Sequence, residues 1–169
     1  MHFCHYITSA MCKFGKYLFT ICIIYTASCG PAMIPETQIP NTSENREIVQ
    51  VVEKYRQAIE NRDIKALKSL VSRKYYKNAS TTSDDSDDYG YAQLEEKILP
   101  LLKDNIKNVQ YVITLKKIEV KDEKAFADYE YNSKFFYVEG GKEQWSAKND
   151  FNRLEFIKED GVWRILRGL

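Results

Sequence analysis

The sequence predicts an α+β fold in which N-terminal helices pack on one face of an antiparallel sheet. Two observations predict this class. Apolar residues recur at helical spacing in the first half of the chain, whereas the part after residue 108 is rich in β-branched and aromatic residues and broken by short turns. Helices followed by a run of strands are typical of a two-layer α+β domain, and 169 residues leave room for one such domain and a short appendage.

Three helices are expected before the sheet. The stretch Asn41-Thr42-Ser43 offers helix N-caps, and apolar residues then follow one helix face from Ile48 to Ile59. Asp63 is expected to cap a second helix that buries Leu67. A third helix follows an acidic loop at residues 79–90, and Pro100 should kink or shorten it. We expect Asp88 to cap this third helix.

The remaining chain reads as four strands joined by short turns. The predicted strands cover residues 109–120, 125–138, 143–158 and 162–167. The sequences KDEK, EGGK and EDG separate them. Connections this short favour an antiparallel meander.

This order of elements resembles the nuclear-transport-factor-2-like superfamily, which includes the SnoaL-like polyketide cyclases. The resemblance rests on VVEKYRQAIENRDIKALKSLVSRKYY, on a third helix after a loop, and on the closing EDGVWRILRGL. It covers residues 45–169, which we take as the domain. It implies that the sheet curls around one end of the helices into a cone that holds a pocket.

The N-terminal region has the three parts of a secretory signal peptide, expected over residues 1–28. Two lysines precede the compact apolar run YLFTICIIY, and small residues follow it. The sequence TASC, ending at Cys29, resembles the lipobox of bacterial lipoproteins, which implies cleavage before Cys29 and lipid attachment to its thiol. Proline-rich residues 29–44 would then form a flexible linker. We expect an exported, lipid-anchored protein of the cell envelope, on the periplasmic side or the cell surface. The alternative is an ordinary secreted protein.

Charge and residue usage exclude several function classes. The net charge is +1 for the whole chain, so no basic surface of the kind that binds nucleic acid is expected. Both histidines precede Cys29, and Cys29 is the last cysteine. The domain therefore lacks the groups for Ser-His-Asp catalysis, Cys-His catalysis or a Cys/His zinc site. We expect no cofactor.

Three carboxylates are weak candidates for a catalytic role, namely Asp128, Glu130 and Asp150. Asp128 and Glu130 alternate with Ala127, Tyr129 and Tyr131, so both acids lie on the sheet face opposite those residues. If the tyrosines face the core, the two acids face solvent. A catalytic acid would need burial to raise its pKa.

The acidic loop TTSDDSDDYGYAQLEE resembles a calcium-binding EF-hand loop only in part. With Asp85 at position 1, Tyr89 stands at position 5, where an oxygen ligand is required. Moving the register by one residue places Tyr89 at the glycine turn instead. We therefore expect no metal site and interpret the segment as a solvated loop.

Aromatic residues suggest either a core or a ligand pocket. Five of them are the pocket candidates: Tyr75, Tyr111, Tyr129, Tyr131 and Trp145. Our first hypothesis is a non-catalytic domain that binds a small hydrophobic ligand or an envelope protein partner. The alternative is an isomerase, cyclase or dehydratase that uses a pocket Asp or Glu with Tyr. Both are compatible with the fold, because one scaffold hosts many functions.

Overall fold

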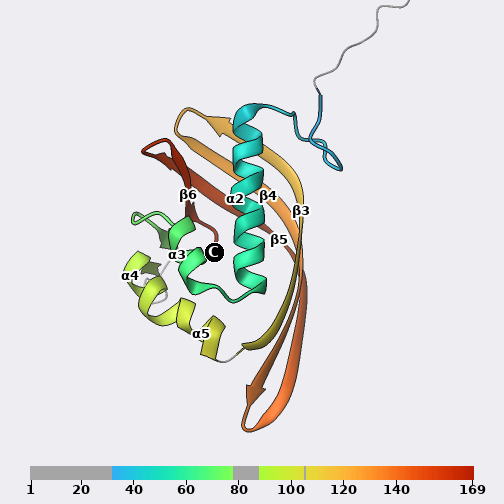
Figure 1. Cartoon of the computed structure of the whole chain (residues 1–169), viewed down its shortest axis with the longest axis vertical. Coiled ribbons are helices and arrows are strands. Elements are labelled where there is room, and N and C mark those ends of the chain that lie inside the picture. The colour runs from blue at the N-terminus through green and yellow to red at the C-terminus, as the bar shows by residue number, and fades with distance from the viewer. Residues whose placement is uncertain (1–31, 78–87, 105) are drawn as a thin grey trace, which may run out of the picture. The chain divides into compact units, whose positions relative to one another are not determined.

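The computed structural model describes residues 32–77, 88–104 and 106–169 (Figure 1). The predicted signal peptide and Cys29 lie outside the described residues, as does most of the acidic loop. The folded unit is Ala32–Leu169. Within the described ranges, no helix combines the length and the apolar character needed to cross a membrane.

Two of the predicted helix caps are confirmed. Helix α2 spans Ser43–Glu60, and the Thr42 side chain accepts a hydrogen bond from the Asn45 N–H at 3.1 Å. Helix α3 spans Ile64–Leu70, and the Asp63 carboxylate accepts from the Ala66 N–H at 2.9 Å. Each cap satisfies a backbone N–H that has no partner within its helix.

The third predicted helix changes its geometry at Pro100. It consists of α4 (Tyr91–Gln93), the π-helical turn η1 (Leu94–Ile98) and α5 (Leu99–Asp104). Proline has no N–H, and its ring collides with the carbonyl four residues earlier in an α-helix. Here the Leu99 N–H donates to the Leu94 oxygen five residues earlier, and this wider turn carries the helix past the proline.

The prediction that Asp88 caps this helix is wrong. The N-cap is Gly90, whose N–H donates to the Gln93 side chain at 3.1 Å. Strands β1 (Tyr76–Lys77) and β2 (Tyr89–Gly90) pair just before the helix. This pairing places Asp88 beside Tyr76, and the Asp88 carboxylate accepts a hydrogen bond from the Tyr76 hydroxyl.

The sheet is the predicted antiparallel meander. Its strands are β3 (Ile106–Lys121), β4 (Lys124–Glu139), β5 (Lys142–Glu159) and β6 (Val162–Arg167), and their order in the sheet is the order of the chain. Adjacent glycines, Gly140 and Gly141, both with positive φ, form the turn between β4 and β5. A bulge in β3 between Leu115 and Lys117 shifts the register against β4.

The helices cover one face of this curved sheet, which we call the inner face, and the opposite face is the outer face (Figure 1). The core lies between α2 and the inner face, where Ile48, Tyr129 and Leu154 are almost fully buried. Strands β4 and β5 extend beyond the helices as a long hairpin (Figure 1).

The expected linker, residues 29–44, is described only from Ala32 onward, and this part makes ordered contacts with the domain. Ile39 is 2% exposed and belongs to the core. The Asn41 N–H donates to the Ala32 oxygen at 2.7 Å, and the Asn45 side chain donates to the Pro40 oxygen at 2.8 Å. Burial of one isoleucine contributes roughly 1.5–3 kcal/mol toward holding this segment against the domain.

Candidate functional site

Three tyrosines from three elements meet on the inner face. Tyr55 comes from α2, Tyr111 from β3 and Tyr129 from β4, and all three are buried. The Tyr55 and Tyr111 rings meet edge to face at 6.0 Å between centroids. Tyr131 extends the cluster, with its ring 5.6 Å from that of Tyr111 and 6.1 Å from that of Tyr129.

The hydroxyl groups of the buried tyrosines form a hydrogen-bonded network. Side-chain hydrogen bonds connect Tyr55, Tyr111 and Tyr129. Asn152 of β5 donates from Nδ2 to the Tyr129 hydroxyl at 3.1 Å and to the Gly168 carbonyl at 2.9 Å. Burial raises the pKa of all three tyrosines, so these hydroxyls stay neutral at physiological pH.

An ion pair lies next to Tyr131 on the same face. Asp150 is directly opposite Tyr131 in the register of β4 and β5. Lys148 Nζ lies 2.7 Å from Asp150 Oδ2 and 5.9 Å from the centre of the Tyr131 ring. The hydrogen bond from Lys148 lowers the pKa of Asp150, and the bond to Asp150 raises that of Lys148. Both groups are about half exposed and stay charged at neutral pH.

The other two predicted carboxylates lie on the outer face. Asp128 forms a two-bond ion pair with Arg153, at 2.5 and 2.8 Å, and this lowers the pKa of Asp128. Glu130 pairs with Lys116 at 2.8 Å, which lowers the pKa of Glu130. The alternation in the sequence predicted this face for both acids.

The five aromatic pocket candidates do not all come together. Tyr111, Tyr129 and Tyr131 share the inner face, as described above. Trp145 is 66% exposed and lies opposite Phe136 on the outer face. Tyr75 is buried elsewhere, with its ring 6.2 Å from that of Tyr89 and its hydroxyl 3.5 Å from the Leu169 oxygen.

Three residues of this site were not among the sequence candidates: Tyr55, Lys148 and Asn152. Tyr55 is one of the apolar-face positions of α2, and helical spacing alone predicts only a core position for it. Lys148 and Asn152 lie two residues on either side of Asp150, so the two-residue repeat of a strand places all three on one face. That repeat was the available signal.

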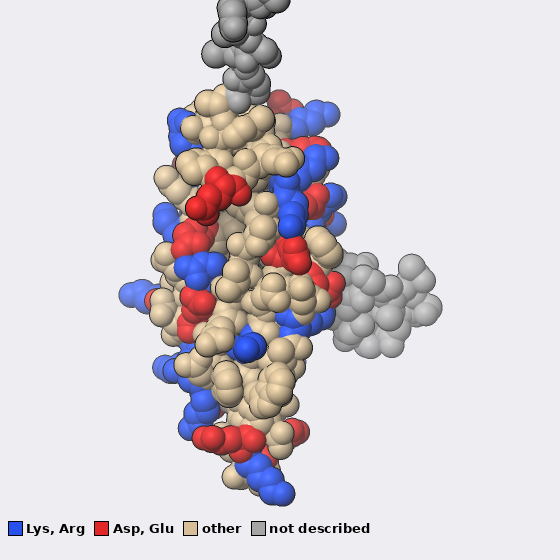
Figure 2. Space-filling view, turned by 90° about the vertical axis from the view of Figure 1, so that its right-hand side faces the viewer, with Lys and Arg blue, Asp and Glu red and all other residues tan. Residues whose placement is uncertain are grey.

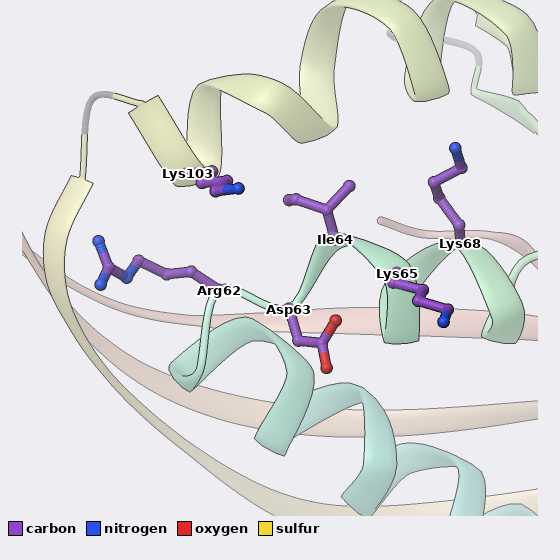
Figure 3. Close-up of a pocket in the computed structure, with 6 residues that line it drawn as sticks. All are labelled: Arg62, Asp63, Ile64, Lys65, Lys68 and Lys103. Carbon is purple, nitrogen blue, oxygen red and sulfur yellow. The ribbon is translucent and has the colours of Figure 1, made fainter.

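A separate hollow of about 390 Å³ lies where α2 turns into α3, and Figure 3 shows its lining. Four basic residues and one acid contribute to it: Arg62, Lys65, Lys68, Lys103 and Asp63. The basic groups do not converge, since Arg62 donates to the Ile106 oxygen and Lys68 pairs with Glu95. Figure 3 shows Arg62 and Lys68 directed away from each other.

No group of three or more His, Cys, Asp and Glu side chains suited to a metal ion occurs in the described parts of the chain. At the edge of the inner-face site, the half-buried Tyr131 ring offers stacking and the exposed Lys148 offers a positive charge.

Comparison with solved structures identifies the fold. A protein from Novosphingobium aromaticivorans, assigned provisionally as a scytalone dehydratase, superposes with a TM-score of 0.61 at 13% identity, over 74% of this chain and 80% of that one. A nuclear transport factor 2-like superfamily protein from Salmonella enterica gives 0.55 at 16% identity, over 72% and 84%. A hexachlorocyclohexane dehydrochlorinase gives 0.55 at 17% identity, over 74% and 82%.

No family model and no curated protein matches the sequence. The chain thus has the nuclear-transport-factor-2-like fold that the order of its elements predicted. At this level of identity the likeness establishes the fold alone.

Proposed function

We propose that this chain is a membrane-tethered lipoprotein whose domain binds a small hydrophobic ligand at the inner face without transforming it. One observation carries the proposal. The buried tyrosine cluster ends at the half-buried ring of Tyr131, while Asp150, the one predicted carboxylate on that face, is held in an ion pair with Lys148.

The protonation states favour binding over acid–base catalysis. A general acid or base works best with a pKa near the working pH. The pKa of Asp150 is lowered from 3.8, and those of Tyr55, Tyr111 and Tyr129 are raised from 10.0. The pKa of each group is thus shifted away from pH 7.

The ligand chemistry follows from the groups at the edge of the cluster. Tyr131 is half-buried, so a flat apolar ring can stack beside it. Lys148 lies within reach of an oxygen atom on such a ring. We infer a ligand with an aromatic or apolar ring that carries a hydroxyl or carboxylate.

A fluorescence titration with 8-anilinonaphthalene-1-sulfonate, an aromatic anion, tests the inner-face site. Tyr131→Ala should weaken binding of this probe by about tenfold, the equivalent of roughly 1.4 kcal/mol. Phe151→Ala is the matched control, because Phe151 is an exposed aromatic residue on the outer face of the same sheet. An equal loss of probe affinity in both variants, or a loss of affinity only in Phe151→Ala, contradicts the proposed site. Mass spectrometry of the natively purified protein then identifies the natural ligand.

The membrane tether is a separate part of the proposal. Its support is the TASC sequence after a basic region and a short apolar run. Several acyl chains at Cys29 would hold the domain at a membrane without a spanning helix, at about 0.8 kcal/mol per buried CH₂. Cell fractionation with mass spectrometry should find acylated protein in membranes, and Cys29→Ala should release it. A Cys29→Ala protein that stays acylated refutes this part.

An enzyme of the isomerase, cyclase or dehydratase type is the second candidate, and the position of Asp150 beside Tyr131 favours it. Asp150→Asn discriminates between the two. Under the binding proposal the variant returns the natural ligand unchanged, as the wild type does. Conversion of that ligand by the wild type but not by Asp150→Asn would establish the enzyme.

A further inference from the structure

The chain just before α2 forms a compact turn that packs on the domain. Met33 and Pro40 pair as a single antiparallel bridge. Between them, the Ile34 N–H donates to the Ile39 oxygen at 2.9 Å. Ile39 is almost fully buried in the core, so the turn is held by a buried side chain as well as by backbone bonds. Residues 32–40 therefore belong to the domain rather than to a flexible linker.

This turn lies at the end of the domain where α2 begins. The Ala32 oxygen accepts from the Asn41 N–H at 2.7 Å. The Asn41 side chain in turn accepts from Arg46, near the start of α2, at 2.7 Å. Figure 1 shows the start of α2 at the end of the sheet that carries the β3–β4 and β5–β6 turns, with the β4–β5 turn at the far end. Ala32 is thus fixed at the end of the domain opposite the β4–β5 turn.

The distance from this turn to Cys29 is short. Only Gly30 and Pro31 separate Cys29 from Ala32. An extended chain covers at most about 3.6 Å per residue, so these three steps span at most about 11 Å. Lipid attachment at Cys29, on which this inference rests, would bring that residue to the surface of the bilayer. Ala32 and the end of the domain around it then lie within about 11 Å of the headgroups.

The surface before and at the start of α2 suits close approach to lipid headgroups. Residues 32–43 contain one charged side chain, Glu36. Met33 is 47% exposed, and Pro35 and Pro40 are also exposed. Figure 2 shows a stretch of uncharged surface at the upper end of the molecule, which is the end at which α2 begins. Because charges lose hydration free energy when they leave water, an uncharged surface can approach the headgroups at little cost.

We propose that a short tether at Cys29 holds residues 32–43 against the headgroups of a lipid bilayer, so that the α2 end of the domain is its membrane-facing surface. The flexible linker expected between Cys29 and the domain is reduced to Gly30 and Pro31 in this arrangement. The β4–β5 turn then points away from the membrane.

The end of the domain that carries the β4–β5 turn agrees with this orientation. Glu139, Lys142 and Glu143 flank the turn, and all three are exposed. Such charged side chains favour water over a lipid surface. Strand β4 has 16 residues and spans roughly 50 Å, which places this turn well clear of the bilayer.

Quenching of a fluorescent label by a lipid with a headgroup nitroxide tests this orientation. The mature acylated chain has no free thiol, since Cys29 is its last cysteine and carries the lipid, so a cysteine introduced at one position takes the label. Met33→Cys reports on the α2 end. Val138→Cys is the matched control, because Val138 is an apolar residue, 39% exposed, near the β4–β5 turn. In phosphatidylcholine vesicles, the nitroxide should quench the label at Met33 at least threefold more than the label at Val138.

A longer tether supplies the second measurement. A stretch of 12 Gly and Ser residues inserted between Pro31 and Ala32 adds roughly 20 Å of average reach. The insertion leaves residues 32–43 intact and releases the domain from the lipid surface, so quenching of the label at Met33 should fall at least twofold. The same insertion in the Val138→Cys chain should leave its quenching unchanged.

The inference is overturned if the nitroxide quenches the label at Met33 no more than the label at Val138, or if the insertion leaves the quenching at Met33 unchanged. Mass spectrometry of the same vesicles separates these outcomes from failure of the proposed tether. A chain acylated at Cys29 that fails either measurement refutes the membrane-facing surface alone, whereas a chain without acyl groups refutes the tether and this inference together.

Discussion

Removal of a single oxygen atom, in Tyr129→Phe, tests whether the tyrosine network stabilises the inner face. Tyr129 is fully buried, and its hydroxyl interacts with Asn152, Tyr111 and Tyr55. The ring is retained, so the variant opens no large cavity. Asn152 keeps its bond to the Gly168 carbonyl at 2.9 Å, so its amide is not orphaned.

The expected cost is about 2 kcal/mol, because a net hydrogen bond contributes about 1 kcal/mol and more than one is lost within a buried network. This corresponds to a fall in Tm of roughly 5–10 °C for a domain of this size. Urea unfolding followed by the fluorescence of buried Trp163 gives the free energy of unfolding.

Tyr137→Phe is the control for Tyr129→Phe. Tyr137 is a half-buried tyrosine of the same strand whose hydroxyl makes no hydrogen bond within the described structure. Its loss should change the free energy of unfolding by less than about 0.5 kcal/mol. A Tyr129→Phe effect as small as that of Tyr137→Phe would show that the network contributes nothing.

Three further predictions concern the frame around the site. Ile39→Ala should lower the free energy of unfolding by about 2–4 kcal/mol if residues 32–40 belong to the fold, and urea unfolding at wild-type stability would show that they do not. Arg153→Gln should destabilise the domain at pH 7 but not below the folded pKa of Asp128. The hydrogen bonds from Arg153 lower the pKa of Asp128 from 3.8. The stabilisation from this ion pair is therefore present above pH 3.8 and is lost as the pH falls through the lowered pKa. Unfolding curves at pH 7 and at a series of pH values below 3.8 check this, and a difference that does not shrink as the pH falls contradicts it. Gly168→Ala should destabilise the protein by more than 1 kcal/mol, because φ is +99° and an added Cβ would lie 2.0 Å from the Arg153 oxygen; an unchanged Tm would refute this conflict.

Local chemistry determined the elements and their order. Thr42 and Asp63 cap helices because their side chains accept bonds from N–H groups only three residues away, and this needs no tertiary contact. The alternation of side chains along the strand around Tyr129 likewise determined the sheet face of Asp128 and Glu130, because it does not depend on how the strand pairs. The meander followed from turns too short for any other connection.

Strand pairing decided which residues share a site. Trp145 and Asp150 are an odd number of residues apart on β5, so they lie on opposite faces and could never line one pocket. Asp150 lies opposite Tyr131 because the turn at Gly140 and Gly141 sets the register of β4 against β5.

Packing between segments distant in the sequence determined the remaining contacts, those of Tyr55 and Ile39. Tyr55 joined Tyr111 because α2 crosses the inner face at that level, a contact between residues far apart in the sequence. Ile39 was buried for the same reason, which no local pattern in a proline-rich stretch could indicate. The sequence by itself determined the elements, their order and the face of each strand residue, because these depend on neighbours along the chain. Only the tertiary structure decided which faces meet, because that depends on register and packing between distant segments.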